Sequence, residues 1–159
     1  MALPQHHLDA WRAVVTSHGA VTERVQRALA AADLPPLSWF ELLWAVKRSP
    51  GRPRMSELAE WLTLSRGGIT KLVDRLEQAG YLRRVSCADD RRSLQAELTP
   101  SGERLLEEMR AVYSDELGRH LSTLTPEEAE LLTAALGRVT SSTCDGAETR
   151  TSPVEQVAR

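Results

Sequence analysis

The side chains in this 159-residue sequence best suited to recognition are cations in its central third. From Lys47 to Arg92 there are 11 Lys and Arg residues against six Asp and Glu residues, a net charge of +5. The rest of the chain has nine basic and 16 acidic residues, a net charge of −7. The overall net charge of −2 therefore hides a separation of positive and negative charge along the sequence. A basic segment between acidic flanks is typical of a module that faces phosphate groups. The alternative is a chance fluctuation among solvated charges.

The residues that usually carry catalysis or bind metals form no recognisable set. The four His residues lack metal-ligand spacing, and no HExxH, GxSxG, Walker or dinucleotide-binding fingerprint occurs. Cys87 and Cys144 form no CxxC pair, which predicts neither a disulfide framework nor a zinc site and suits a reducing cytoplasm. We therefore expect a protein that is not an enzyme, with no metal or cofactor. Cys87 itself, near Arg83 and Arg84, is either an oxidisable thiol or, as we favour, an inert turn residue.

Composition points to a soluble globular chain. Hydrophobic residues make up 42% and charged residues 26%, which are ordinary globular values. No stretch approaches the roughly 18 apolar residues that span a bilayer, and the first residues show no signal-peptide pattern. We expect a cytoplasmic protein with no membrane partner.

Periodicity and capping signals predict six helices and one hairpin around the cations. The first helix covers Leu8 to Leu29, and the second runs from a capping box of Ser38 and Glu41 to Arg48. Ser56 is predicted to cap a short third helix. The remaining predicted boundaries are Ser65 as N-cap and Gly80 as C′ residue of the fourth helix, extended runs at 81–85 and 93–98, the Thr99-Pro100 start of the fifth helix, and the Thr125 to Glu128 start of the sixth.

The order of a short helix, a turn, a second helix and a basic hairpin is that of a helix-turn-helix with a wing. The fourth helix buries Ile69, Leu72, Val73 and Leu76, so its opposite face presents small and polar residues around Gly67 and Lys71. Only the major groove of DNA admits a helix and shows a full donor and acceptor code. Arginines at the hairpin tip suit a narrow minor groove. The alternative is that both surfaces merely meet water.

Several motifs resemble those of the MarR family of transcription regulators. They are the runs 55–59 and 64–77, the segment 80–84, and the wing signature Asp90-Arg91-Arg92-Ser93 that leads to 98–102. The resemblance covers about residues 8–139 and implies a winged-helix homodimer that binds pseudo-palindromic double-stranded DNA operators and is often released by phenolic or aromatic ligands. It makes the helix from Ser65 to Gln78 the recognition helix and Arg92 the minor-groove arginine. Unlike redox-sensing members, the chain has no cysteine in its first helix.

We therefore predict a mostly α (α+β) fold, a winged helix-turn-helix with long N- and C-terminal dimerisation helices. The expected divisions are a dimerisation helix at 1–36, the DNA-binding module at 37–99, C-terminal dimerisation helices at 100–142 and a disordered tail at 143–159. The residues expected to contact DNA are Ser65, Arg66, Gly67, Thr70, Lys71, Arg75, Arg91 and Arg92.

An effector site is predicted between the dimerisation helices and the DNA-binding module. Phe40 and Trp44 are four residues apart on an arc that the core does not obviously claim, whereas Trp39 shares the inward arc. Trp11 and His18 offer a second wall on the first helix. Apolar walls with one or two polar groups suit a planar aromatic ligand. Core packing explains all five residues too, and for His18 we favour a hydrogen-bonded core position over a ligand hydrogen bond or a pH-sensitive contact.

The function predicted from the sequence is a sequence-specific DNA-binding repressor released by a small aromatic ligand. Two alternatives stay open. One is a dimeric ligand-binding or protein-adaptor module that no longer binds DNA. The other is an enzyme acting on the aromatic molecule, for which the sequence offers no catalytic set.

Overall fold

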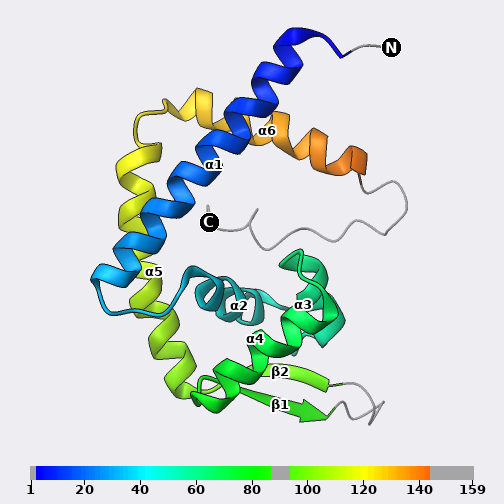
Figure 1. The fold of residues 1–159 in the computed structure, drawn as a ribbon, viewed down its shortest axis with the longest axis vertical. Coiled ribbons are helices and arrows are strands. Elements are labelled where there is room, and N and C mark those ends of the chain that lie inside the picture. The colour runs from blue at the N-terminus through cyan, green and yellow to red at the C-terminus, as the bar shows by residue number, and fades with distance from the viewer. Residues whose placement is uncertain (1–2, 87–93, 144–159) are drawn as a thin grey trace.

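The computed structural model describes residues 3–86 and 94–143 of the chain (Figure 1). They form six helices and one antiparallel hairpin, which confirms the predicted mostly α fold class. The elements in order are α1 (Gln5–Ala31), α2 (Leu37–Arg48), α3 (Met55–Trp61), α4 (Arg66–Gln78), β1 (Leu82–Ser86), β2 (Leu94–Leu98), α5 (Pro100–Leu121) and α6 (Pro126–Thr143). The predicted tail at 143–159 begins at the last residue of α6, and the rest of it lies outside the described residues.

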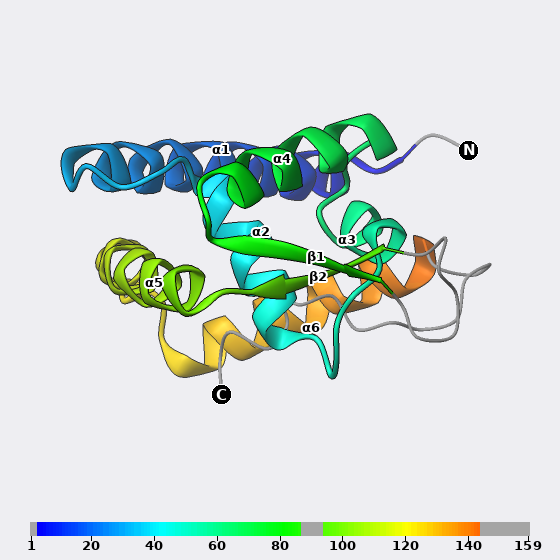
Figure 2. The same cartoon turned by 90° about the horizontal axis from the view of Figure 1, so that it is seen from below.

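The elements divide into a lower and an upper part in Figure 1. The lower part holds α2, α3, α4 and the hairpin, and Figure 2 shows α4 lying beside the two strands from below. Helix α1 packs along α5, and α6 crosses the upper part. The long helix α5 joins the two parts, because its N-terminal end also contacts α2 and β2.

The hydrophobic core lies where α1, α2, α4 and α5 meet. Its fully buried side chains include Leu29, Leu43, Leu76 and Met109, one from each of these helices. The described side chains of α6 contribute no buried residue. The apolar side of α6 is therefore not covered by the rest of the described chain.

Three predicted helix starts and one helix end are confirmed by their hydrogen bonds. Ser65 Oγ accepts from Gly68 N at 3.1 Å, and Thr99 Oγ1 accepts from Gly102 N at 3.0 Å. At α6, Thr125 N donates to Glu128 Oε2 at 2.9 Å while Glu128 N donates back to Thr125 Oγ1 at 3.3 Å. Gly80 has φ of +79°, the left-handed conformation that a C′ glycine adopts most easily.

Two predicted caps are wrong. Helix α2 begins at Leu37 with Pro36 as its N-cap, so Ser38 lies inside the first turn and does not cap it. The burial of Leu37 in the core favours this earlier start. Likewise α3 begins at Met55, where the backbone N–H of Arg54 donates to Glu57 Oε2 at 2.9 Å, and Ser56 lies within the helix.

The hairpin pairs Leu82 with Leu98 and Arg84 with Ala96. Its predicted half-buried face is only partly present: Ala96 is fully buried, but Leu94 is 43% exposed. A third segment supports β2, because Ala96 N donates to Pro53 O at 3.0 Å. The base of the wing is thus fixed to the chain that precedes α3.

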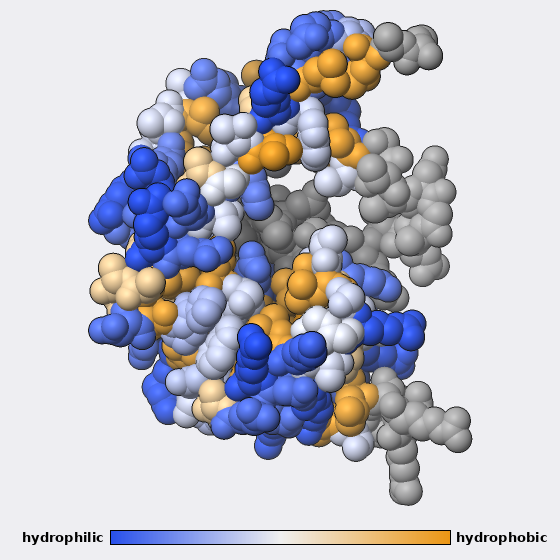
Figure 3. All heavy atoms as spheres, viewed as in Figure 1, coloured by the Kyte–Doolittle hydropathy of each residue, from blue (hydrophilic) through white to orange (hydrophobic). Residues whose placement is uncertain are grey.

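Apolar side chains remain exposed on α1 and α6. In α1 only Val25 and Leu29 are buried, whereas Trp11 is 64% exposed and Val15 is also exposed. On α6, Leu131 is 71% exposed. Figure 3 shows orange, apolar patches on the upper part of the molecule, where α1 and α6 lie. These helices carry more apolar surface than one copy of the fold covers.

Candidate nucleic-acid interface

One face of α4 points away from the core and carries the predicted reading residues. Arg66, Gly67, Thr70, Lys71 and Arg75 are all exposed on it. The opposite face is buried through residues that follow a helical repeat, namely Ile69, Leu72, Val73 and Leu76. The core therefore fixes which side chains of α4 are available to a partner.

The first turn of α4 is open to close approach. A Cβ added to Gly67 would meet nothing within 4 Å, so the fold itself does not require glycine there. At Gly68 the added Cβ would lie 3.2 Å from Ser65 Oγ, the capping oxygen, which makes that position tight. Ser65 thus shapes the helix start as N-cap, and its hydroxyl hydrogen stays available to an acceptor.

Thr70 uses part of its hydrogen-bonding capacity within α4. Its Oγ1 donates to the backbone oxygen of Arg66 at 2.8 Å. The oxygen lone pairs are left, and they can accept from an amino group at a base edge.

The cations of the basic segment fall into two groups in the structure. Arg66, Lys71 and Arg75, all on the exposed face of α4, form no ion pair within the described residues. Several cations elsewhere in the segment are paired: Lys47 Nζ lies 2.7 Å from Glu103 Oε1, and Arg52 and Arg83 share Glu97. Much of the excess positive charge that remains uncompensated therefore lies on α4.

Glu97 on β2 is held between two arginines. Arg83 Nη2 lies 2.7 Å from its Oε2 and Arg52 Nη2 lies 3.1 Å from its Oε1. The hydrogen bonds from Arg83 and Arg52 lower the pKa of the Glu97 carboxyl, which therefore stays ionised at neutral pH. This cluster neutralises part of the positive charge at the base of the wing.

Arg84 on β1 pairs with two carboxylates of α4. Its Nη2 lies 2.6 Å from Asp74 Oδ1, and its Nη1 bonds Glu77 Oε2. Apart from the excess of positive charge, nothing in the sequence indicates this contact, because it depends on how a strand packs against a helix. Arg91 and Arg92, predicted to contact DNA from the wing tip, lie outside the described residues, as does Cys87.

The predicted effector residues are only partly brought together. Phe40 is 5% exposed and belongs to the core, so the expectation that its arc is unclaimed is wrong. The reason is Tyr113 on α5, whose ring stacks on Phe40 with centroids 4.5 Å apart. Phe40 also stacks with Trp44 at 5.9 Å, as the four-residue spacing predicted. Sequence reasoning missed Tyr113 as a member of this aromatic group.

Trp44 has one notable polar atom. Its Nε1 is buried and has no hydrogen-bond partner among the described residues. The guanidinium of Arg48 lies 5.6 Å from the ring centroid of Trp44, in cation–π range. The indole N–H is therefore the group in this region that a ligand oxygen would satisfy.

The other predicted effector residues lie apart from that stack or at its margin. Trp39 packs edge-on against Tyr81, with ring centroids 5.9 Å apart. Trp11 is exposed on α1. His18 is close enough to Glu41 to influence it electrostatically: desolvation raises the pKa of the Glu41 carboxyl, and the charge of His18 opposes that rise. Desolvation, aided by the charge of Glu41, also raises the pKa of Tyr113. His18 is exposed on α1, so the core position expected for it is wrong, and Trp11 and Trp39 do not join the stack.

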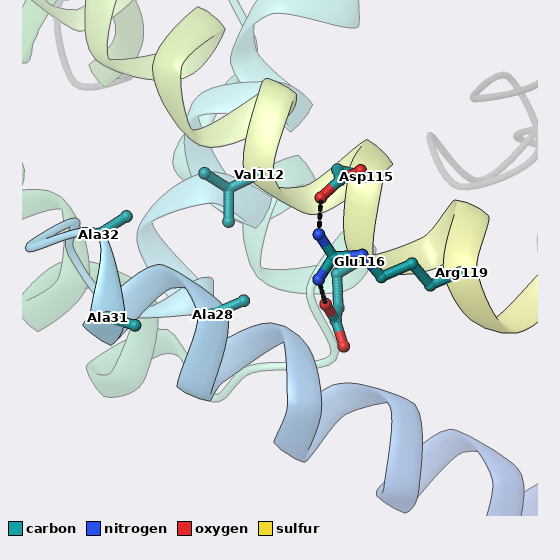
Figure 4. Close-up of a pocket in the computed structure, with 7 residues that line it drawn as sticks. All are labelled: Ala28, Ala31, Ala32, Val112, Asp115, Glu116 and Arg119. Atoms are coloured by element: carbon teal, nitrogen blue, oxygen red, sulfur yellow. Dashed lines mark hydrogen bonds and ion pairs between the residues drawn. The ribbon is translucent and has the colours of Figure 1, made fainter.

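A pocket of about 320 Å³ lies elsewhere, between the C-terminal half of α1 and α5 (Figure 4). Alanines form one wall, and the other holds Glu116 and Arg119. Arg119 bonds Asp115 at 2.6 Å and Glu116 at 3.1 Å, so its charge is already compensated. None of the five predicted effector residues lines this pocket; its lining residues are Ala28, Ala31, Ala32, Val112, Asp115, Glu116 and Arg119.

Residues 3–86 and 94–143 contain neither a cluster of metal ligands nor a candidate membrane-spanning helix. No group of three or more His, Cys, Asp or Glu side chains there could hold a metal ion. Within the same residues, no helix is long and apolar enough to cross a membrane.

Both the sequence and the fold of this chain are similar to those of known proteins. Residues 32–93 match the sequence model of the MarR family. AbsC, a MarR family transcriptional regulator from Streptomyces coelicolor, is 27% identical with a TM-score of 0.79, over 90% of this chain and 97% of that one. Sco3205, a MarR family transcriptional regulator from the same organism solved in complex with DNA, is 26% identical with a TM-score of 0.79, over 95% and 96%. The transcriptional regulator BldR from Sulfolobus solfataricus is 25% identical with a TM-score of 0.77, over 89% and 99%.

Proposed function

We propose that the chain is a transcriptional regulator of the MarR family that binds double-stranded DNA and is not an enzyme, because residues 32–93 match the model of that family and the fold is similar to those of MarR family regulators. In this proposal α4 enters the major groove and reads base edges through its exposed face. The DNA complex of Sco3205, at 26% identity and nearly full coverage, supports a shared mode of action.

The observation that carries the proposal is the distribution of unpaired cations. Arg66, Lys71 and Arg75 share the exposed face of α4 and have no carboxylate partner within the described residues. A cation left unpaired in the folded chain is available to a phosphate or a base acceptor. An adaptor module that had lost DNA binding would have no use for this arrangement.

Dimerisation is part of the proposal. One recognition helix has too small a footprint for operator-grade affinity, so two must lie about 34 Å apart across a two-fold axis and read a pseudo-palindrome. The exposed apolar residues of α1 and α6, such as Trp11 and Leu131, supply a surface that a second copy would cover.

We further propose that the protein is a cytoplasmic repressor released by a small aromatic ligand. The aromatic stack of Phe40, Trp44 and Tyr113 joins α2 of the DNA-binding module to α5, and the N–H of Trp44 is unsatisfied beside it. A ligand bound there could change how the module sits on α5. The unsatisfied N–H supports Trp44 as an effector contact, with Phe40 as part of the supporting wall.

The experiment is selection of duplexes from a random DNA pool by the wild-type protein, followed by affinity measurements at fixed salt. Lys71→Ala and Thr70→Ala should each weaken binding to the selected duplex by roughly 1 to 3 kcal/mol where the side chain reads a base edge. Lys47→Ala is the matched control, because it removes the same charge from a lysine already paired with Glu103.

The outcomes separate the alternatives. Loss of affinity for all duplexes alike, with a flatter salt dependence, would assign Lys71 to a phosphate instead of a base. Failure of the wild type to enrich any duplex, or unchanged affinity in both α4 variants, would remove α4 from the interface and reject the proposal.

A further inference from the structure

Arg84 holds α4 at three points along its length. From β1, its Nη2 contacts Asp74 Oδ1 at 2.6 Å and the backbone oxygen of Thr70 at 3.4 Å. Its Nη1 bonds Glu77 Oε2, and its own backbone N–H donates to Glu77 Oε1 at 2.9 Å. Residues 70, 74 and 77 recur at helical spacing, so the Arg84 guanidinium contacts one side of the recognition helix.

These contacts resist both sliding and rotation of α4. They span seven residues, about 10 Å of helix, whereas a shift of one residue would turn the helix by about 100°. The planar fork of a guanidinium can bond two carboxylates at once, which a lysine ammonium does with less directional control. The Arg84 side chain is only 19% exposed, so it is also packed between the strand and the helix.

The same contacts compensate charge beneath the DNA-binding face. Asp74 lies about one helical turn after Lys71 on α4, and an uncompensated carboxylate there would repel phosphates. Partial burial lowers the pKa of the Arg84 guanidinium, but its bonds to Asp74 and Glu77 raise it further, with a net rise. Arg84 therefore stays charged and balances part of the negative charge of its two partners.

We propose that Arg84 is a positioning residue for DNA recognition, fixing the orientation of α4 relative to the wing so that both read the duplex in one register. The inference rests on the proposed function. Arg84 touches no base or phosphate in this scheme, because its donors are committed to α4. It acts on sequence discrimination by fixing which side chains of α4 meet the groove.

Arg83 provides the matched control. It is the neighbouring residue on the same strand with the same side chain, but it is 63% exposed and bonds Glu97 within the hairpin. Within the described residues, no hydrogen bond or ion pair joins the Arg83 side chain to α4. Arg83→Met therefore removes an equal charge from the wing without releasing the recognition helix.

The test measures the ratio of affinities for the duplex selected by the wild type and for a scrambled duplex of equal length, at fixed salt. Arg84→Met should lower this ratio by about tenfold or more, the scale of one misplaced base contact. Arg84→Lys should recover part of the loss, and Arg83→Met should keep the wild-type ratio. Circular dichroism and urea unfolding establish that each variant is folded under the binding conditions.

A purely structural role predicts a different result. In that case Arg84→Met would lower the urea midpoint, but the protein that remains folded would show the wild-type ratio of affinities for the selected and the scrambled duplex. That result would overturn the inference. If Arg84→Met does not fold, the double variant Asp74→Asn with Glu77→Gln is the test, because it weakens the same contacts between Arg84 and α4 while removing carboxylate charge. A lower affinity ratio with tighter binding to the scrambled duplex supports the proposal, whereas an unchanged ratio overturns it. Failure of the wild type to select any duplex would instead reject the proposed function.

Discussion

Gly102, in the first turn of α5, lies against the backbone of Tyr81 so closely that an added Cβ would be 2.0 Å from the carbonyl oxygen of Tyr81. The same oxygen accepts from Thr99 N at 3.1 Å, and Thr99 Oγ1 donates to Gly80 O at 2.7 Å. Gly80 and Tyr81 in turn close the C-terminal end of α4. The start of α5 is therefore fixed to the end of the recognition helix.

Gly102→Ala should destabilise the fold. The obstacle is backbone, which cannot move aside as a flexible side chain would, so we expect a loss of about 3 kcal/mol in the free energy of unfolding. Urea unfolding monitored by circular dichroism measures it. Gly118→Ala is the control on the same helix, because a Cβ there meets nothing within 4 Å and alanine favours helix. Equal stability of the two variants would contradict the close approach.

Arg92→Ala should weaken DNA binding while leaving dimerisation and thermal stability nearly unchanged. The prediction follows from the wing signature and from the attraction of a narrow, electronegative minor groove for arginine. Arg91→Ala should show a smaller effect. Binding measured at two salt concentrations checks it, and wild-type affinity in Arg92→Ala would show that the minor-groove assignment is wrong.

Leu132→Glu combined with Leu136→Glu should shift the protein from dimer to monomer. Both leucines are exposed one helical turn apart on α6, and charges buried in an apolar interface are strongly unfavourable. Sedimentation at micromolar concentration measures the change. Thr133→Glu adds charge to another side of α6 and should leave the dimer intact. A wild-type protein that sediments as a stable monomer would contradict the proposed homodimer.

Local signals in the sequence predicted the elements well. Ser65, Thr99 and Thr125 cap their helices through a hydrogen bond from the backbone N–H three residues later to the side-chain oxygen. This bond lies within one turn, so the local sequence is enough to predict it. Ser38 and Ser56 do not cap, because α2 already begins at Leu37 and α3 already begins at Met55. Where packing and capping favour different starts, the nearby sequence alone does not decide.

Contacts between segments that are distant in the chain could not be predicted from the sequence. Phe40 joins the core because Tyr113, 73 residues later, stacks on it, and no periodicity within α2 reveals that. Arg84 is similar, since its partners Asp74 and Glu77 lie on another element. The charge count found the basic segment, but only the structure separates paired from unpaired cations.

Acidification should weaken the fold through Glu116. This carboxylate is 8% exposed and accepts from His120 Nε2 at 3.0 Å, and that bond, with the charges of Arg119, His120 and Arg24, lowers its pKa below the ordinary 4.5. A lowered pKa gives stability that is present above pH 4.5 and is lost as pH falls through the lowered value. The free energy of unfolding of the wild type should decline there, and Glu116→Gln should remove part of that decline. Glu108→Gln, an exposed glutamate of α5, is the control for removing one charge.

The last prediction concerns the effector. A planar aromatic ligand with an acceptor oxygen should bind at the stack of Phe40, Trp44 and Tyr113, because it would satisfy the buried N–H of Trp44. Trp44→Phe keeps an aromatic ring but removes the donor, so it should weaken ligand binding by roughly 1 to 3 kcal/mol. Trp61→Phe, on α3, is the matched control.

Release of DNA requires more than binding. The ligand must favour a conformer whose recognition helices are wrongly spaced, because equal affinity for both conformers shifts nothing. Tryptophan fluorescence titrated with a panel of aromatic acids, alongside operator affinity, measures both steps. A compound that quenches the fluorescence yet leaves operator affinity unchanged would contradict the coupling. Full ligand response in Trp44→Phe would contradict the site, even where the coupling holds.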